Sequence, residues 1–144
     1  MCLIYRLFIG CVLLFLLGCR EVPNPEQEAL ARFFATESIN SDSIKALIVL
    51  TERGCSGCNV RFSDFALRYI NKGDKLIVMK ASGVVFDVGP YQQAHNVIFD
   101  LNNRFGFPDT TSVYLLGHQQ LDSVIRIDAF NLDQSMQWLE KRLK

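Results

Sequence analysis

The sequence predicts an α/β domain in which helices cover both faces of one sheet. Two continuous apolar runs, residues 46–50 and 76–79, have the length and composition of strands that are buried on both faces. Segments with helical spacing alternate with these runs, and the chain closes with a hairpin pattern and an amphipathic helix. This order favours one sheet with helices on both faces, because strands buried on both faces need cover on both sides.

The expected elements follow one another in the order α-β-α-β-α-β-β-α. Helices are expected where apolar side chains recur at helical spacing, in residues 26–35, from 55 to a C-terminal signal near 71–73, in 91–105 and in 132–143. Strands are expected in residues 46–50, 76–79, 113–116 and 121–127, the last two as a hairpin. Asn24 and Pro25 are typical of the cap and first turn of the first helix.

The N-terminal segment has the layout of a secretory signal. Arg6 precedes an apolar run over residues 7–17, and the run ends in Leu16-Leu17-Gly18-Cys19. A run this short does not cross a hydrocarbon core of about 30 Å, which needs about 20 apolar residues. The four residues resemble the lipobox of bacterial lipoproteins, which implies cleavage before Cys19 and diacylation of its sulfur. An uncleaved signal anchor is the alternative.

These features divide the chain into three parts. We expect a lipoprotein signal peptide at residues 1–18, a lipidated tether at 19–27 and a single domain at 28–144. A protein with two acyl chains stays at a bilayer far more durably than one with a single chain. The domain is therefore expected in the cell envelope, anchored to a bacterial membrane and facing the periplasm or the exterior.

The charge balance excludes one large class of partners. Acidic and basic residues number 15 each in a chain of 144 residues, so the domain has no basic field that would recruit nucleic acid. We expect no nucleic-acid partner.

The cysteines point to one short element of the mature chain. Cys2 and Cys11 leave with the signal peptide, and Cys19 carries the lipid, so that Cys55 and Cys58 remain. Exported compartments permit disulfides, but a single closely spaced pair does not make a multi-bridge scaffold. The pair is therefore interpreted as a redox or metal element.

The pair and its surroundings resemble thioredoxin. The motif Cys55-Ser56-Gly57-Cys58 lies between a buried strand and a helix, and the order of the following elements is similar to that family over nearly all of residues 25–144. The resemblance implies a three-layer α/β/α sandwich with a central mixed sheet and a C-terminal hairpin and helix. It also implies a thiol–disulfide oxidoreductase that acts on exported proteins with thiols or disulfides and uses no bound organic cofactor.

Two departures from the family pattern concern the residues before the pair. Gly54 precedes Cys55, where the family usually has tryptophan. The family's buried acid would fall near Val49, so it is missing, and Glu52 is the nearest carboxylate. Proton handling by a buried acid is therefore not predicted.

A third departure concerns the substrate-binding loop. The family's cis-proline directly precedes a hairpin strand, whereas Pro108 lies several residues ahead of Val113. We expect Pro108 to be this proline after a small insertion, because a cis bond is essentially a proline property. Thr110 or Thr111 occupying the position is the alternative, so all three are candidate substrate-binding residues.

The chemistry requires a thiolate at neutral pH. Cys55 is expected at a helix N-terminus, where the macrodipole and unpaired backbone N–H groups favour a charged sulfur, and Arg53 and Arg61 are possible cationic neighbours. The resemblance implies that Cys55 attacks a client disulfide and that Cys58, sheltered in the first turn, resolves the mixed disulfide.

Other readings of the pair remain open. An inert disulfide or two buried thiols would have no catalytic role. A structural zinc site needs four ligands, and His95 and His118 fall in separate elements, so we assign no metal ligands. Two thiolates with a histidine suit Cu(I), which leaves a copper carrier or a non-catalytic binding module as the alternative function.

Overall fold

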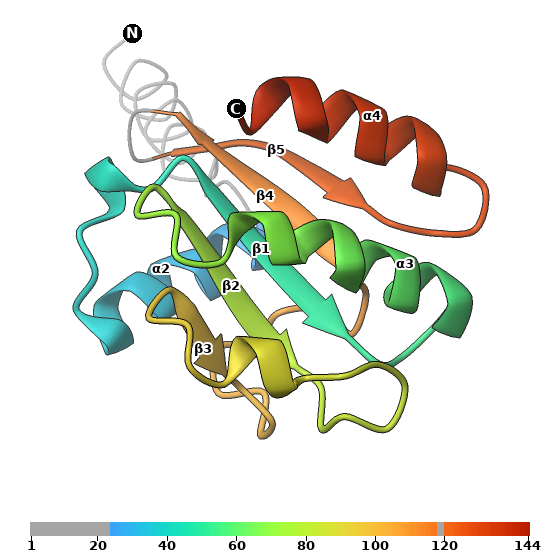
Figure 1. The fold of residues 1–144 in the computed structure, drawn as a ribbon. Helices are drawn as coiled ribbons and strands as arrows, with labels where there is room; N and C mark the ends of the chain where they lie inside the picture. The colour runs from blue at the N-terminus through green and yellow to red at the C-terminus, as the bar shows by residue number, and fades with distance from the viewer. Residues whose placement is uncertain (1–23, 118–119) are drawn as a thin grey trace, which may run out of the picture.

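A five-stranded sheet lies at the centre of the computed structural model, which describes residues 24–117 and 120–144 (Figure 1). The strands lie side by side in the order β3-β2-β1-β4-β5. Parallel pairing joins β1 to β2 and β2 to β3, whereas β4 is antiparallel to both β1 and β5. Their bounds are β1 (Ala46–Thr51), β2 (Lys75–Lys80), β3 (Val97–Phe99), β4 (Ser112–Gly117) and β5 (Gln120–Arg126). The predicted mixed sheet is confirmed.

Helices cover both faces of this sheet. Figure 1 shows α3 and α4 on the viewer's side and α2 behind. The α-helices are α2 (Pro25–Glu37), α3 (Ser56–Ala66) and α4 (Leu132–Arg142), and the short 3₁₀ helices are η1 (Ser41–Ser43), η2 (Leu67–Tyr69) and η3 (Gly89–Tyr91). None of the helices in the described part of the chain has the length and apolar character needed to cross a bilayer.

Strand β1 is buried along its whole length because its two faces serve two cores. Ile48 and Leu50 join the cluster that α3 and α4 cover, whereas Leu47 and Val49 join the cluster that α2 covers. All six of its residues are buried. The continuous apolar run thus reflects cover on both sides of the sheet.

Helix α2 begins as the sequence predicts. The Asn24 side chain accepts a hydrogen bond from the backbone N–H of Glu26 at 3.0 Å, and Pro25 occupies the first helical position. Glu26 is buried and forms an ion pair with Arg126 of β5. The folded part therefore starts inside residues 19–27, the segment expected to be tether. Cys19 and residues 1–18 lie outside the described residues.

The helix expected over residues 91–105 is wrong. The short η3 helix and a set of turns lead instead to β3, which adds to the edge of β2 with Val97 opposite Ile77. Beyond β3, the Asp100 carboxylate accepts hydrogen bonds from the backbone N–H groups of Arg104 at 2.7 Å and Phe105 at 3.4 Å. Bonds of this kind give the backbone an alternative to helix, and pairing with β2 overrides the helical spacing.

Candidate functional site

The Cys55–Cys58 pair lies where β1 passes into α3, as the sequence predicts. The two residues form a disulfide with a Cα–Cα distance of 5.2 Å. Cys55 is the N-cap of α3, and its sulfur accepts the backbone N–H of Cys58 at 3.2 Å. Cys55 is half-buried, whereas Cys58 is only 4% exposed. The pair therefore consists of a partly exposed cysteine at a helix N-terminus and a buried cysteine in the first turn.

Gly54 provides the turn that brings the chain from β1 into α3. Its backbone φ is +85°, which lies in the left-handed region, and a Cβ built on it would contact nothing within 4 Å. The backbone conformation, and not a lack of space, therefore favours glycine at this position. A tryptophan, usual here in the family that the sequence resembles, would be strained.

We predict that Gly54→Ala lowers the free energy of unfolding by about 1–2 kcal/mol, the cost of a left-handed conformation for a residue with a Cβ. Gly57→Ala is the matched control, because Gly57 is helical and also has open space around its Cα. That control should leave the stability unchanged or slightly raised. Urea unfolding of both variants measures the difference, and equal stabilities would contradict the role of the backbone conformation.

A buried hydrogen-bond network joins the turn between β1 and α3 to the segment before β4. The Asn59 amide nitrogen donates to the backbone carbonyl of Arg53 at 2.8 Å, and the Asn59 side-chain oxygen accepts from the Thr111 hydroxyl at 2.7 Å. The Thr111 oxygen in turn accepts the backbone N–H of Thr51 at 3.3 Å. Thr51, Asn59 and Thr111 are all at most 2% exposed. The network holds the end of β1, the first turn of α3 and the start of β4 together.

Of the three candidate substrate-binding residues, Thr111 is the one that this network brings to α3. The expectation of a cis bond before Pro108 is wrong, because the described residues contain no cis peptide bond. The carbonyl of Pro108 instead lies 3.4 Å from the Lys80 ammonium, in the neighbouring wall of the site. Thr110, which directly precedes Thr111 in the chain, is half-buried. A substrate-binding role for these residues stays a prediction.

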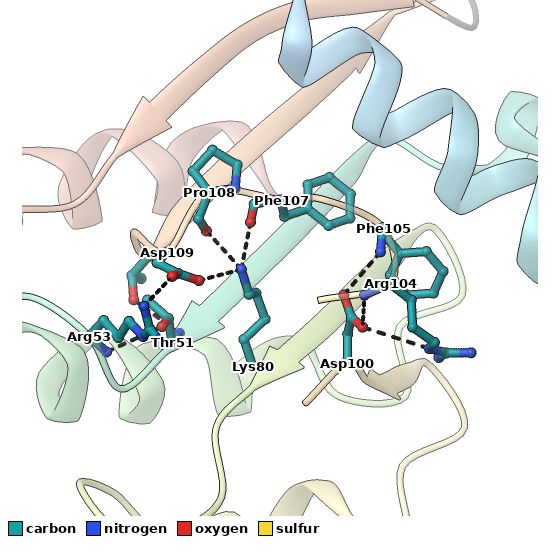
Figure 2. Close-up of polar contacts among 10 residues, drawn as sticks. Thr51, Arg53, Lys80, Asp100, Arg104, Phe105, Phe107, Pro108 and Asp109 are labelled. Atoms are coloured by element: carbon teal, nitrogen blue, oxygen red, sulfur yellow. Dashed lines mark hydrogen bonds and ion pairs between the residues drawn. The ribbon is translucent and has the colours of Figure 1, made fainter. Parts of the chain in front are cut away.

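The buried side chain of Lys80 bonds to several groups of the loop between β3 and β4 (Figure 2). Its ammonium donates to the carbonyl of Phe107 at 2.5 Å and to the carboxylate of Asp109 at 2.6 Å, and its side chain is only 5% exposed. The other Asp109 oxygen accepts from the Arg53 guanidinium at 2.6 Å. The hydrogen bond from Lys80 lowers the pKa of Asp109, and the positive charges of Lys80 and Arg53 add to this against an opposing effect of burial.

Both of the cations expected near the pair are engaged by carboxylates. Arg53 pairs with Asp109, and Arg61 pairs with Asp133 of α4 at 2.5 Å. Each carboxylate offsets much of the field that its arginine would exert on Cys55. The start of α3, with its unpaired N–H groups, is therefore the main feature that favours a thiolate at Cys55.

Glu52 does not take the place of the missing buried acid. Its carboxylate accepts the backbone N–H groups of four successive residues, 82–85, at 2.6–2.9 Å and also the Ser82 hydroxyl at 3.0 Å. Burial alone would raise the pKa of Glu52, but these hydrogen bonds outweigh it and lower the pKa to about 2. Glu52 stays ionised and fixes the loop after β2 to the end of β1.

The ionised Glu52 should make the free energy of unfolding depend on pH in the acidic range. Because its pKa in the folded state is depressed, its contribution is complete above the ordinary value of 4.5 and is lost as the pH falls toward about 2. We predict that Glu52→Gln destabilises the domain at pH 7 by about 1 kcal/mol, a value discounted for partial exposure. The difference from wild type should shrink toward pH 2. Unfolding curves measured between pH 7 and 2 test this, and parallel pH profiles would contradict it.

Residues that the sequence did not single out complete the site, namely Asn59, Lys80 and Asp109. A polar residue directly after Cys58, on a helix whose inner face is mostly apolar, is the signal that could have found Asn59. Within the described residues, no group of three or more His, Cys, Asp or Glu side chains is placed to hold a metal ion. His95 is exposed, and His118 lies outside the described residues.

Comparisons with models of protein families, with curated proteins and with solved structures find no match for this chain. What the site can do is therefore inferred from its own residues and their geometry.

Proposed function

We propose that the domain is a thiol–disulfide oxidoreductase of the thioredoxin type that exchanges disulfides with exported proteins. The observation that carries this proposal is the asymmetry of the pair. Cys55 is partly exposed at the start of α3 and its sulfur accepts a backbone N–H, while Cys58 is buried in the first turn of the helix. An attacking thiolate needs access and stabilisation of its charge, whereas a resolving thiol needs proximity to the attacker.

The exchange proceeds in two balanced steps. The Cys55 thiolate attacks one sulfur of a client disulfide, so that a Cys55–client disulfide forms and the second client sulfur leaves as a thiolate that takes up a proton. Cys58, once deprotonated, then attacks the Cys55 sulfur, which forms the Cys55–Cys58 disulfide and releases the first client sulfur. Two electrons pass from the pair to the client. The reverse sequence oxidises a client dithiol.

The thioredoxin-like architecture is part of this proposal. It is supported by the disulfide that follows the central strand β1, by the antiparallel β4 and β5 later in the chain, and by the contact of Thr111 with α3. Besides Gly54 and the missing acid near Val49, the chain departs from the resemblance at two points of its structure, since a trans bond precedes Pro108 and β3 with turns replaces the expected third helix.

We also propose that the domain is a lipoprotein of the bacterial cell envelope, with Cys19 diacylated. Leu16-Leu17-Gly18-Cys19 at the end of the apolar run supports this. The intact mass of protein extracted from membranes, compared with that of Cys19→Ala, tests it. An unmodified residue 19 or a retained signal would contradict lipidation.

The reduction potential of the pair tests the proposed activity. The domain is equilibrated in glutathione buffers and its thiols are counted by alkylation. We expect a potential between about −270 and −120 mV, the range of exchange proteins, whereas a value below about −300 mV would indicate a structural disulfide and contradict the proposal. Anaerobic Cu(I) titration of the same reduced domain addresses the copper carrier, which would bind the metal tightly through both thiolates.

A further inference from the structure

A polar cavity of about 370 Å³ opens at the carboxyl ends of β1 and β2, beside residues 51–53, which lead toward Cys55. The end of β1 forms one wall and the loop between β3 and β4 forms another, with Arg53, Lys80, Asp109 and Leu101 among the lining residues. Arg53 lies two residues before Cys55, so their Cα atoms are at most about 7.6 Å apart. A molecule held by Arg53 in this cavity would therefore lie near the chain segment that leads to Cys55.

The charged groups of the cavity differ in how much bonding capacity they have left. The buried Lys80 ammonium donates to Phe107 and Asp109, and the Glu52 carboxylate accepts hydrogen bonds from the backbone N–H groups of residues 82–85. Both Asp109 oxygens accept strong bonds, one from Lys80 and one from Arg53. The anionic groups that line the cavity are therefore already compensated by neighbouring donors.

Arg53 is the exception. Its side chain is 76% exposed, and its ion pair with Asp109 uses one nitrogen, Nη1. A guanidinium has five N–H donors in a fork that matches a carboxylate, so Arg53 can keep Asp109 and still bind a second carboxylate through its remaining donors. Leu101, which is 62% exposed on the loop after β3, offers an apolar contact at the same cavity.

We propose that Arg53 selects client segments that carry a carboxylate two residues from the cysteine that exchanges with Cys55. The spacing is chosen because an extended client advances about 3.3–3.6 Å per residue, so two residues cover about 7 Å, close to the upper limit of the Cα–Cα distance between Cys55 and Arg53. The chemical class of the preferred client is therefore an acidic segment in extended conformation. This inference rests on the proposed oxidoreductase activity and specifies its substrate.

The test uses short peptides that contain one cysteine as a mixed disulfide with a small thiol. The peptides differ only in Glu, Gln or Lys two residues from the cysteine, and the rate constant of their exchange with the reduced domain is measured. We expect the Glu peptide to react about 3- to 10-fold faster than the Gln peptide, and the ratio to fall toward one in 0.5 M salt because this contact lies near solvent.

Matched variants separate Arg53 from general electrostatics. Arg53→Gln should remove the preference for the Glu peptide, whereas Arg61→Gln, which breaks the pair with Asp133 on α4, should keep it. Equal rates for the three peptides on wild type, a faster Lys peptide, or a preference that survives in Arg53→Gln would overturn this proposal while leaving the oxidoreductase intact. No exchange with any peptide would overturn the proposed function itself.

Discussion

Replacing Cys58 with serine should trap exported client proteins as covalent adducts of the domain. Cys58 is buried behind Cys55 in the first turn of α3, where it is placed to clear the mixed disulfide within the same encounter. Without it, the Cys55–client disulfide has no internal thiol to resolve it and should persist. Non-reducing gels of membrane extracts should show adducts that collapse on addition of a reductant, and mass spectrometry should identify the clients.

Cys55→Ser is the matched control for this experiment, since it also leaves a single thiol but removes the accessible one. It should form few adducts. Equal amounts of adduct in the two variants, or none in Cys58→Ser, would contradict the assigned roles. For a copper carrier the two substitutions should instead weaken Cu(I) binding to a similar degree, because each removes one ligand from the same site.

Replacing Thr111 with valine should destabilise the domain by about 1–3 kcal/mol, the usual cost of leaving buried polar groups without partners. Valine keeps the shape of threonine but lacks the hydroxyl that donates to Asn59 and accepts from the Thr51 N–H. Both partners are buried, so water does not easily replace the lost bonds. Urea unfolding monitored by circular dichroism measures the loss.

Thr111→Ser separates the hydroxyl from the methyl group. Serine retains both hydrogen bonds and should keep more of the stability than valine does. A valine variant as stable as the serine variant would show that the network contributes little. The network joins the end of β1, the first turn of α3 and the start of β4 near the disulfide. Its loss should therefore also raise the rate at which the reduced Cys58 is alkylated.

The parts of the fold predicted from sequence are those fixed by local pattern and burial. The runs 46–50 and 76–79 become β1 and β2 because each strand buries one face in each of the two cores. The cap at Asn24 is confirmed because its side chain acts on the next turn of the chain. Residues 91–105 were predicted wrongly as a helix, because the pairing of β3 with β2 and the bonds of Asp100 override the helical spacing and cannot be recognised from that spacing.

The candidate site divides in the same way. Cys55 and Cys58 and their place at the start of a helix follow from the motif and the preceding apolar run. The bond from Thr111 to Asn59 joins residues 52 positions apart in the sequence, and the bond from Lys80 to Asp109 joins residues 29 apart. Contacts of this range depend on how strands order in the sheet, which spacing alone does not reveal.

Timed alkylation of the reduced domain across pH tests the central claim most directly, which is that Cys55 is the activated nucleophile of a redox pair. The start of α3 should stabilise its thiolate, so Cys55 should react faster than Cys58 and the midpoint of its rate should lie below about 8.5, the value of an ordinary thiol. Peptide mapping assigns each label to its cysteine. Equal rates for the two thiols, each with an ordinary midpoint, would contradict the claim and leave only a structural disulfide.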